Sequence, residues 1–139
     1  MKVEKTMLKN LVFIRLNPGD DLLQALTLAM KKNNINNAII LMGVGSVTSH
    51  HFHVVASTDI PPKEYNTKGE AAADIVNING AVINGRVHAH IIFSNEAVAY
   101  GGHLEKGCEV LTFSIITLAE VDEDFDKWDS VGNIEDLLD

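Results

Sequence analysis

The amino-acid sequence predicts an α+β domain, in which a largely antiparallel, twisted or barrel-like sheet is accompanied by a few helices. Seven segments of strand length are rich in β-branched and apolar residues and are bounded by Gly, Asn, Pro or Ser. One stretch, near residues 20–32, instead repeats its apolar residues at the spacing of a helix. The 139 residues, 46% of them hydrophobic, suit one compact core, so no second folding unit is needed before the C-terminal tail.

The expected helix follows a turn at Asn17-Pro18-Gly19, and Asp20 is its predicted N-cap. Lys31-Lys32 suit the negative end of the helix dipole, and Asn33-Asn34 predict its end. Its apolar stripe consists of Leu22, Leu23, Leu26, Ala29 and Met30. A stripe of this kind predicts a helix that packs on the core rather than a cofactor motif.

The first strand is expected at Leu11 to Leu16, before the helix. The later strands are expected at about residues 37–43, 46–56, 71–79, 86–94, 97–100 and 107–120. Residues 57–69 are expected to form the one long loop. Residues 1–121 are therefore predicted to be one domain, and residues 122–139 an acidic C-terminal tail.

The segment from Gly85 to Gly107 places three histidines where one metal ion can collect them. His88 and His90 share one face of a predicted strand, because side chains two residues apart point the same way. Their backbones lie roughly 6.5 Å apart, and two inward-leaning rings can reach an ion at about 2.0–2.1 Å from each nitrogen. His103, which follows Gly101-Gly102, is the candidate third ligand.

Three neutral imidazoles leave the fourth position of a tetrahedral zinc ion open, as in catalytic zinc sites. We therefore predict Zn²⁺ or another divalent transition metal at His88, His90 and His103, since imidazole also suits copper, iron and nickel. The open position would take water or a small-molecule ligand. The alternative interpretation is that the first two histidines form the polar side of a half-solvated strand and that the third lies in a glycine turn.

Four motifs in order, RLNPGDDL, GVGSV, the His88-Ala89-His90 strand and GGHLEKGCEV, resemble the plants-and-prokaryotes-conserved (PPC) domain from about Leu11 to Val121. The resemblance implies an α/β domain that assembles as a homotrimer, with a metal at His88, His90 and His103. In plants this domain follows AT-hook segments in nuclear proteins, and stand-alone prokaryotic members are commonly labelled DNA-binding proteins. One departure is Ser114, which stands where the family usually has an acid.

The net charge of −8 argues against direct nucleic-acid binding once it is located along the chain. Residues 122–139 hold eight of the nineteen acids and one of the eleven bases, so residues 1–121 are nearly neutral. They carry no basic stripe and no Arg-Gly-Arg-Pro core of an AT-hook. The tail also carries apolar residues at spacings near three: Phe125, Trp128, Val131, Ile134, Leu137 and Leu138. A solvated acidic end and a short docked piece both stay open.

We predict a cytoplasmic protein with no membrane segment. The longest apolar runs are far shorter than the roughly 20 residues of a membrane helix, and the N-terminus lacks a signal-peptide pattern. Cys108 is the single cysteine, which fits a reducing compartment. Its place in a predicted strand favours a small buried residue over a nucleophile.

Two further motifs are weaker. Gly43-Val44-Gly45-Ser46 resembles a phosphate loop, but it has no Walker lysine and no helix pattern after it, which favours a glycine-kinked strand. His50, His51 and His53 form a second cluster, in which only the last two share a strand face. They are interpreted as exposed strand histidines, or as neighbours that join or gate the metal site.

Three functions remain open from the sequence. The first is a trimeric metal-binding module whose open three-histidine site binds a small ligand. The second is a DNA-binding or regulatory protein without its own AT-hook. The third is a zinc-dependent enzyme, because the PPC fold resembles those of acetolactate decarboxylase and of a zinc ester hydrolase. An enzyme also needs a proton-transfer group, for which the candidates are Glu105, Arg86, Glu64 and Tyr65.

Overall fold

The computed structural model describes residues 3–125 and 128–130. Within them lie one helix and six strands: β1 (Leu8–Leu16), α1 (Leu22–Asn33), β2 (Ala38–Val55), β3 (Glu64–Ile83), β4 (Arg86–Ser94), β5 (Ala99–Leu104) and β6 (Val110–Val121). The expectation of a few helices is wrong for this part of the chain, which has one. Every other apolar segment has strand length and pairs into the sheet.

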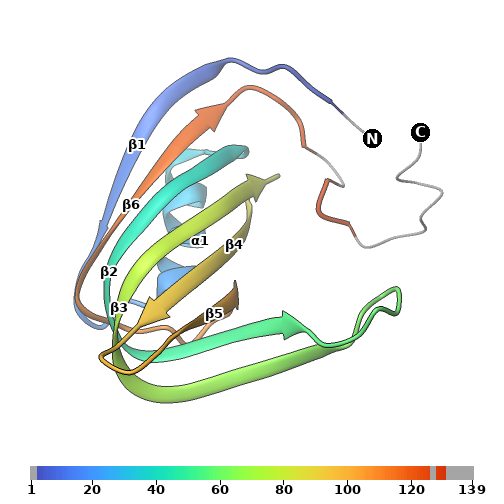
Figure 1. Cartoon of the computed structure of the whole chain (residues 1–139). Helices are drawn as coiled ribbons and strands as arrows, with labels where there is room; N and C mark the ends of the chain where they lie inside the picture. Colours follow the sequence, from blue (N-terminus) through green and yellow to red (C-terminus); the bar gives the residue numbers. More distant parts are fainter. Residues whose placement is uncertain (1–2, 126–127, 131–139) are drawn as a thin grey trace.

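The strands form one antiparallel sheet in the order β1-β6-β2-β3-β4-β5, and β2 also pairs with β5. Strands β2 and β3 are 18 and 20 residues long and bend along their length, so the sheet curls around α1 (Figure 1). The far end of β2 thereby reaches β5 and closes the curl on one side. This confirms the predicted antiparallel sheet.

The core lies between α1 and the concave face of the sheet. Helix α1 buries Leu22, Leu26 and Met30, as its apolar stripe predicts. All six strands contribute buried residues, β1 through Leu16. The largest fully buried ones on the sheet are Val47, Ile78, Val82, Ile91, Phe93, Leu104, Val110, Ile116 and Leu118. The residues on β4 that alternate with this buried set therefore face outward.

Asp21, not Asp20, caps α1, which corrects the predicted N-cap by one residue. The Asp21 carboxylate accepts a hydrogen bond from the Gln24 N–H at 3.0 Å. The Asp20 carboxylate turns back instead and accepts the Asn17 N–H at 2.8 Å. Asp21 also accepts the Gly107 N–H at 2.7 Å, so the cap ties the start of α1 to the loop after β5.

The two strands predicted at residues 37–43 and 46–56 are one strand, β2. Gly45 lies inside it at φ 151°, where an added Cβ would stand 2.2 Å from the Phe113 carbonyl oxygen. Gly45 therefore allows β2 to approach β6 closely, and the strand continues where a phosphate loop would need a helix.

Two other boundaries differ from the prediction. The second half of the expected loop at residues 57–69 belongs to β3, which pairs from Glu64 onward with the end of β2. Residues 99–104 form β5, so His103 lies in a strand rather than in a glycine turn. Both segments pair through their backbones, whereas their side chains lack the apolar alternation that marks a strand.

Apolar side chains cover much of the outer face of the sheet from β1 to β4. Among them are Phe13, which is 69% exposed, Leu11 at 54%, Val76 at 52% and Leu41 at 50%. No helix in the described residues is long and apolar enough to cross a membrane. The predicted tail residues from Val131 to Leu138 lie outside the described residues.

Candidate metal centre

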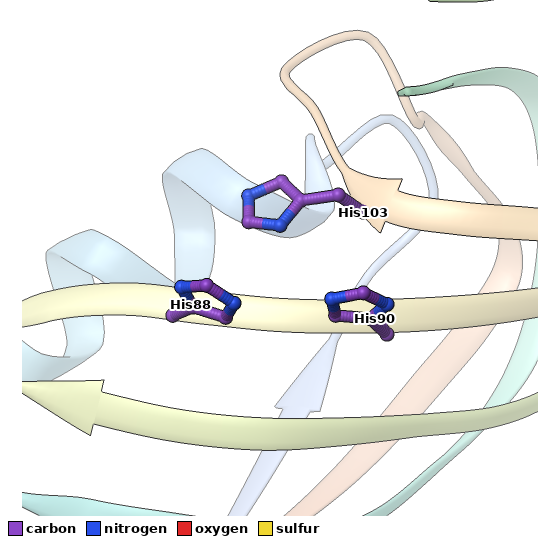
Figure 2. A group of neighbouring side chains, drawn as sticks. All are labelled: His88, His90 and His103. Carbon is purple, nitrogen blue, oxygen red and sulfur yellow. The ribbon is translucent and has the colours of Figure 1, made fainter. Parts of the chain in front are cut away.

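The structure brings together the three histidines that the sequence predicts. His88 and His90 project from the outer face of β4, and His90 stands directly opposite His103 on the neighbouring strand β5. The ring centroid of His103 lies 4.7 Å from that of His88 and 5.4 Å from that of His90. Figure 2 shows the His103 ring over the space between the other two.

The donor atoms of this group fit a transition-metal ion. One ring nitrogen from each of His88, His90 and His103 lies within 4.8 Å of the other two. Nitrogens bound to one tetrahedral ion stand about 3.4 Å apart when each bond is about 2.0–2.1 Å. Small inward movements of the side chains would close this difference.

The environment also favours the neutral imidazole that a metal requires. Partial burial lowers the pKa of His90, and the nearby His88 and His53 lower it further. Partial burial likewise lowers the pKa of His103, helped by His53, His88 and His90 and opposed by Glu105. Both rings therefore keep a free nitrogen at neutral pH.

A cavity of about 520 Å³ opens beside the three rings. Its walls come from β2, β3, β4, β5 and the segment before β3, and its lining residues are His53, Val54, Val55, Pro62, Glu64, His88, His90, Gly102 and His103. A second hollow of about 610 Å³ borders only one of the three, His90. Of these two cavities, the first is the one that all three histidines line.

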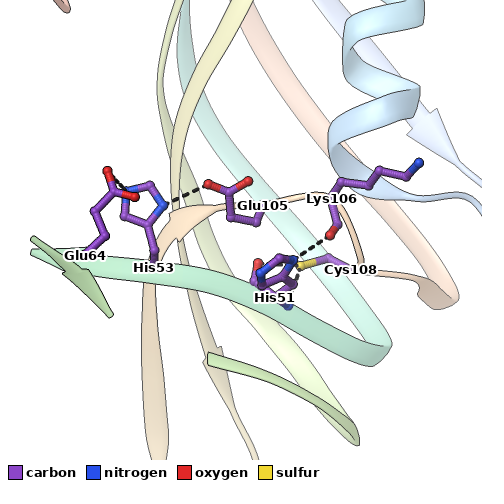
Figure 3. Close-up of polar contacts among 6 residues, drawn as sticks. All are labelled: His51, His53, Glu64, Glu105, Lys106 and Cys108. Atoms are coloured by element: carbon purple, nitrogen blue, oxygen red, sulfur yellow. Dashed lines mark hydrogen bonds and ion pairs between the residues drawn. The ribbon is translucent and has the colours of Figure 1, made fainter. Parts of the chain in front are cut away.

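His53 is the residue of the second histidine cluster that joins this site. It stands opposite His103 in the β2–β5 pairing, and the two rings stack with centroids 4.5 Å apart. The Nδ1 atom of His53 lies 2.8 Å from a carboxylate oxygen of Glu105, and its Nε2 lies 3.6 Å from one of Glu64 (Figure 3). His53, His103 and Glu105 thus form a second group with metal-ligand atoms within 4.8 Å of one another.

The other two histidines of that cluster point elsewhere. His50 packs among Phe52, Phe93 and Tyr100, with its ring centroid 5.1 Å from that of the tyrosine. His51 places its Nδ1 atom 2.7 Å from the Lys106 carbonyl oxygen. Neither lines the shared cavity, so neither joins the site.

The four candidate proton-transfer groups are placed differently. Glu64 lines the cavity, and Glu105 contacts His53. Arg86 pairs with Asp129 of the C-terminal segment, and Tyr65 is 65% exposed on β3. The contact of Asp129 with β4 was not foreseen, and the one signal for it was the apolar Phe125 and Trp128 beside it in an otherwise charged tail.

Ser114 and Cys108 are buried structural residues. The Ser114 hydroxyl donates to the Val44 carbonyl oxygen at 3.0 Å, so the serine that replaces the usual acid joins β6 to β2. The Cys108 thiol donates to the His51 carbonyl oxygen at 3.3 Å and is fully buried. Burial raises the pKa of this thiol to about 11.

Cys108 is therefore expected to react very slowly with Ellman's reagent in the native protein. At pH 8 a thiol with this pKa is deprotonated to about one part in a thousand, and the thiolate is the nucleophile. Release of thionitrobenzoate should be slow in buffer and complete in denaturant. Native protein that reacts as fast as denatured protein would contradict this placement of the thiol.

Comparisons with known proteins give one family match and several similar structures. A family model described as the Plants and Prokaryotes Conserved (PCC) domain matches residues 4–122. The metal-containing protein of Archaeoglobus fulgidus has a similar structure, with a TM-score of 0.77 and 21% identity over 89% of this chain and 88% of that one. The structure of a plant- and prokaryote-conserved protein of Pyrococcus horikoshii has a TM-score of 0.76 and 23% sequence identity, and the match covers 89% of this chain and 87% of that one.

A structure named as a putative DNA-binding protein of Bacteroides thetaiotaomicron gives a TM-score of 0.72 and 17% identity, over 86% of each chain. At these identities the structural matches show the shared fold alone. The bifunctional protein GlmU of Synechococcus sp. (strain JA-3-3Ab) is 27% identical over 108 residues, 77% of this chain. The match spans only 16% of that protein's length.

Proposed function

The chain belongs to the Plants and Prokaryotes Conserved domain family, and from that premise we propose that it is a metal-binding module with an open three-histidine site for a small ligand. The observation that carries the proposal is the convergence of His88, His90 and His103 on one point beside a shared cavity. Zinc or another divalent transition metal suits a set of three imidazoles. The metal-containing relative from Archaeoglobus fulgidus supports the same assignment.

The protein's own residues would position the three ligand rings and shape the cavity beside them. Two adjacent strands fix the three rings, and the β4–β5 pairing sets their distance. When bound, the ion would polarise a carbonyl group or acidify a water molecule at its open position. Val54, Val55 and Pro62 supply an apolar wall, while His53 and Glu64 supply polar groups, so the cavity suits a small molecule with one polar end.

Cobalt substitution tests the open position. Co²⁺ bound at three imidazoles and water should give visible absorption bands, and these should shift when azide or acetate is added. The His103→Ala variant is the control and should give weaker cobalt binding. Cobalt bands that do not respond to either anion would indicate a closed, structural site, and no cobalt uptake by the wild type would refute the proposal.

We also propose that the apolar outer face of the sheet is covered in a homotrimer. Exposed residues such as Phe13, Leu11 and Leu41 present more apolar surface than a monomer usually leaves in water. Light scattering should give about three times the 15.2 kDa chain mass, and Phe13→Asp should lower it. A monomer in both proteins would refute this proposal.

A second candidate function is a zinc-dependent hydrolase or decarboxylase-like enzyme. One observation favours it: His53, held between Glu64 and Glu105, borders the same cavity as the three predicted ligands. Zinc-loaded protein should then cleave activated esters or decarboxylate 2-hydroxy-3-keto acids. Equal rates for wild type and His53→Ala would count against it. Direct binding to DNA, by contrast, gains no support from the nearly neutral charge of residues 1–121.

A further inference from the structure

Asp129 connects the acidic C-terminal segment to the strand that carries two of the three histidines. One oxygen of its carboxylate accepts a hydrogen bond from Nη2 of Arg86 at 2.5 Å. The other oxygen lies 3.4 Å from Nδ1 of His88. Because Arg86 and His88 are two residues apart on β4, they share a face, and a single carboxylate reaches both.

This contact is more enclosed than its position near the end of the chain would suggest. The side chain of Asp129 is 9% exposed, against 65% for Arg86 and 37% for His88. Its neighbour Trp128 packs edge-on against Phe125, with ring centroids 5.3 Å apart. The Asp129 carboxylate is therefore largely shielded from solvent and paired with Arg86 and His88.

Asp129 approaches His88 from outside the ligand space. Neither Asp129 nor Arg86 lines the cavity that the three histidines share. A carboxylate that competed with a ligand would have to enter that cavity. Asp129 contacts His88 at Nδ1 instead.

We infer that Asp129 is a positioning residue for the metal site, acting through His88. Its carboxylate accepts the Nδ1–H of His88, which fixes the tautomer whose Nε2 carries the free lone pair, and Arg86 holds the carboxylate in place. Histidine ligands commonly donate their second ring N–H to a carboxylate, which orients the ring and makes it a better ligand. The inference rests on the proposed metal-binding function.

The same contact makes the tail sensitive to the metal. If Asp129 improves metal binding through His88, then metal binding must strengthen the docking of Asp129 by the same factor, because coupling free energies are reciprocal. Trp128, the only tryptophan, stands next to Asp129 in the chain, so its fluorescence reports this docking directly. Arg86 contributes to this docking through its ion pair with Asp129.

The test compares Asp129→Asn with Asp122→Asn in the full chain. Both variants remove one negative charge from the same segment, but Asp122 pairs with Lys9 at 2.6 Å, away from the histidines. Competition with a chromophoric chelator should show zinc affinity about 10- to 100-fold lower for Asp129→Asn and nearly unchanged for Asp122→Asn. Nitrogen-15 spectra of the metal-free protein should show the Nδ1–H tautomer of His88, and Asp129→Asn should reduce it.

Three outcomes would overturn the inference, and they are distinguishable. Zinc bound equally tightly by wild type and both variants would leave the metal site intact and remove the role of Asp129. Equal losses in the two variants would mean that general charge attraction, and not the contact with His88, acts on the ion. A wild-type chain that binds no zinc would refute the proposed function itself, and this inference with it.

Discussion

His90→Ala is expected to weaken zinc binding by about 10²–10³-fold while the protein stays folded. A four-ligand zinc site has an apparent binding free energy of about 10–16 kcal/mol, or about 2.5–4 kcal/mol per ligand, and the variant removes one of three imidazoles. The fold should persist because His90 lies on the exposed face of β4, opposite the buried residues Ala89 and Ile91. The measurement is competition with a chromophoric chelator, with circular dichroism to check folding.

The matched control is His51→Ala. This variant also removes an imidazole from a strand, but His51 contacts the Lys106 carbonyl oxygen and does not line the cavity. It should bind zinc as the wild type does. Zinc affinity that falls equally in both variants, or in neither, would contradict the assignment of His90 as a ligand.

Gly101→Ala is expected to lower the free energy of unfolding by about 2–4 kcal/mol and to weaken zinc binding. An added Cβ would stand 1.9 Å from the carbonyl oxygen of Ile91 and 2.9 Å from its carbon. These are backbone atoms of β4, so no side-chain rotation relieves the clash and β5 has to move away. His103 lies two residues further along β5 and would move with it.

Gly19→Ala separates this effect from the general cost of replacing a glycine. Gly19 has φ 86°, and an added Cβ there meets nothing within 4 Å, so the cost is backbone strain of about 1 kcal/mol. Urea unfolding in the presence of chelator gives the stabilities, and chelator competition gives the zinc affinities. If Gly101→Ala and Gly19→Ala lower the free energy of unfolding and the zinc affinity equally, the close contact between β4 and β5 is contradicted.

The helix and the strand with the first two histidines could be predicted from the sequence. The apolar stripe of α1 repeats at the helical period, and His88 and His90 alternate with buried residues along β4. Both patterns involve residues that are close in the sequence, so they can be recognised without knowing which distant segments pack together. The C-terminal end of α1 was predictable for a different reason, because its C-cap Asn34 has a φ of 54°, a left-handed conformation that asparagine tolerates.

The remaining features depend on contacts between distant residues. Glycines 101 and 102 are typical of a turn, and only their backbone pairing with β4 makes this segment a strand. His53 reaches His103 because β2 bends far enough to pair with β5, which no periodicity reveals. Asp129 meets Arg86 and His88 across more than forty residues of chain. The apolar Phe125 and Trp128 indicate that this segment can dock, but they do not indicate which residues it meets.

The most direct test of the metal centre is elemental analysis of untagged protein that was purified without a metal column. Wild-type protein should hold about one zinc or other transition-metal ion per chain. The His88→Ala/His90→Ala double variant should hold none and keep the same oligomeric mass. Wild-type protein that holds no metal, even after incubation with zinc and dialysis, would contradict the account and reduce the three histidines to the polar face of a sheet.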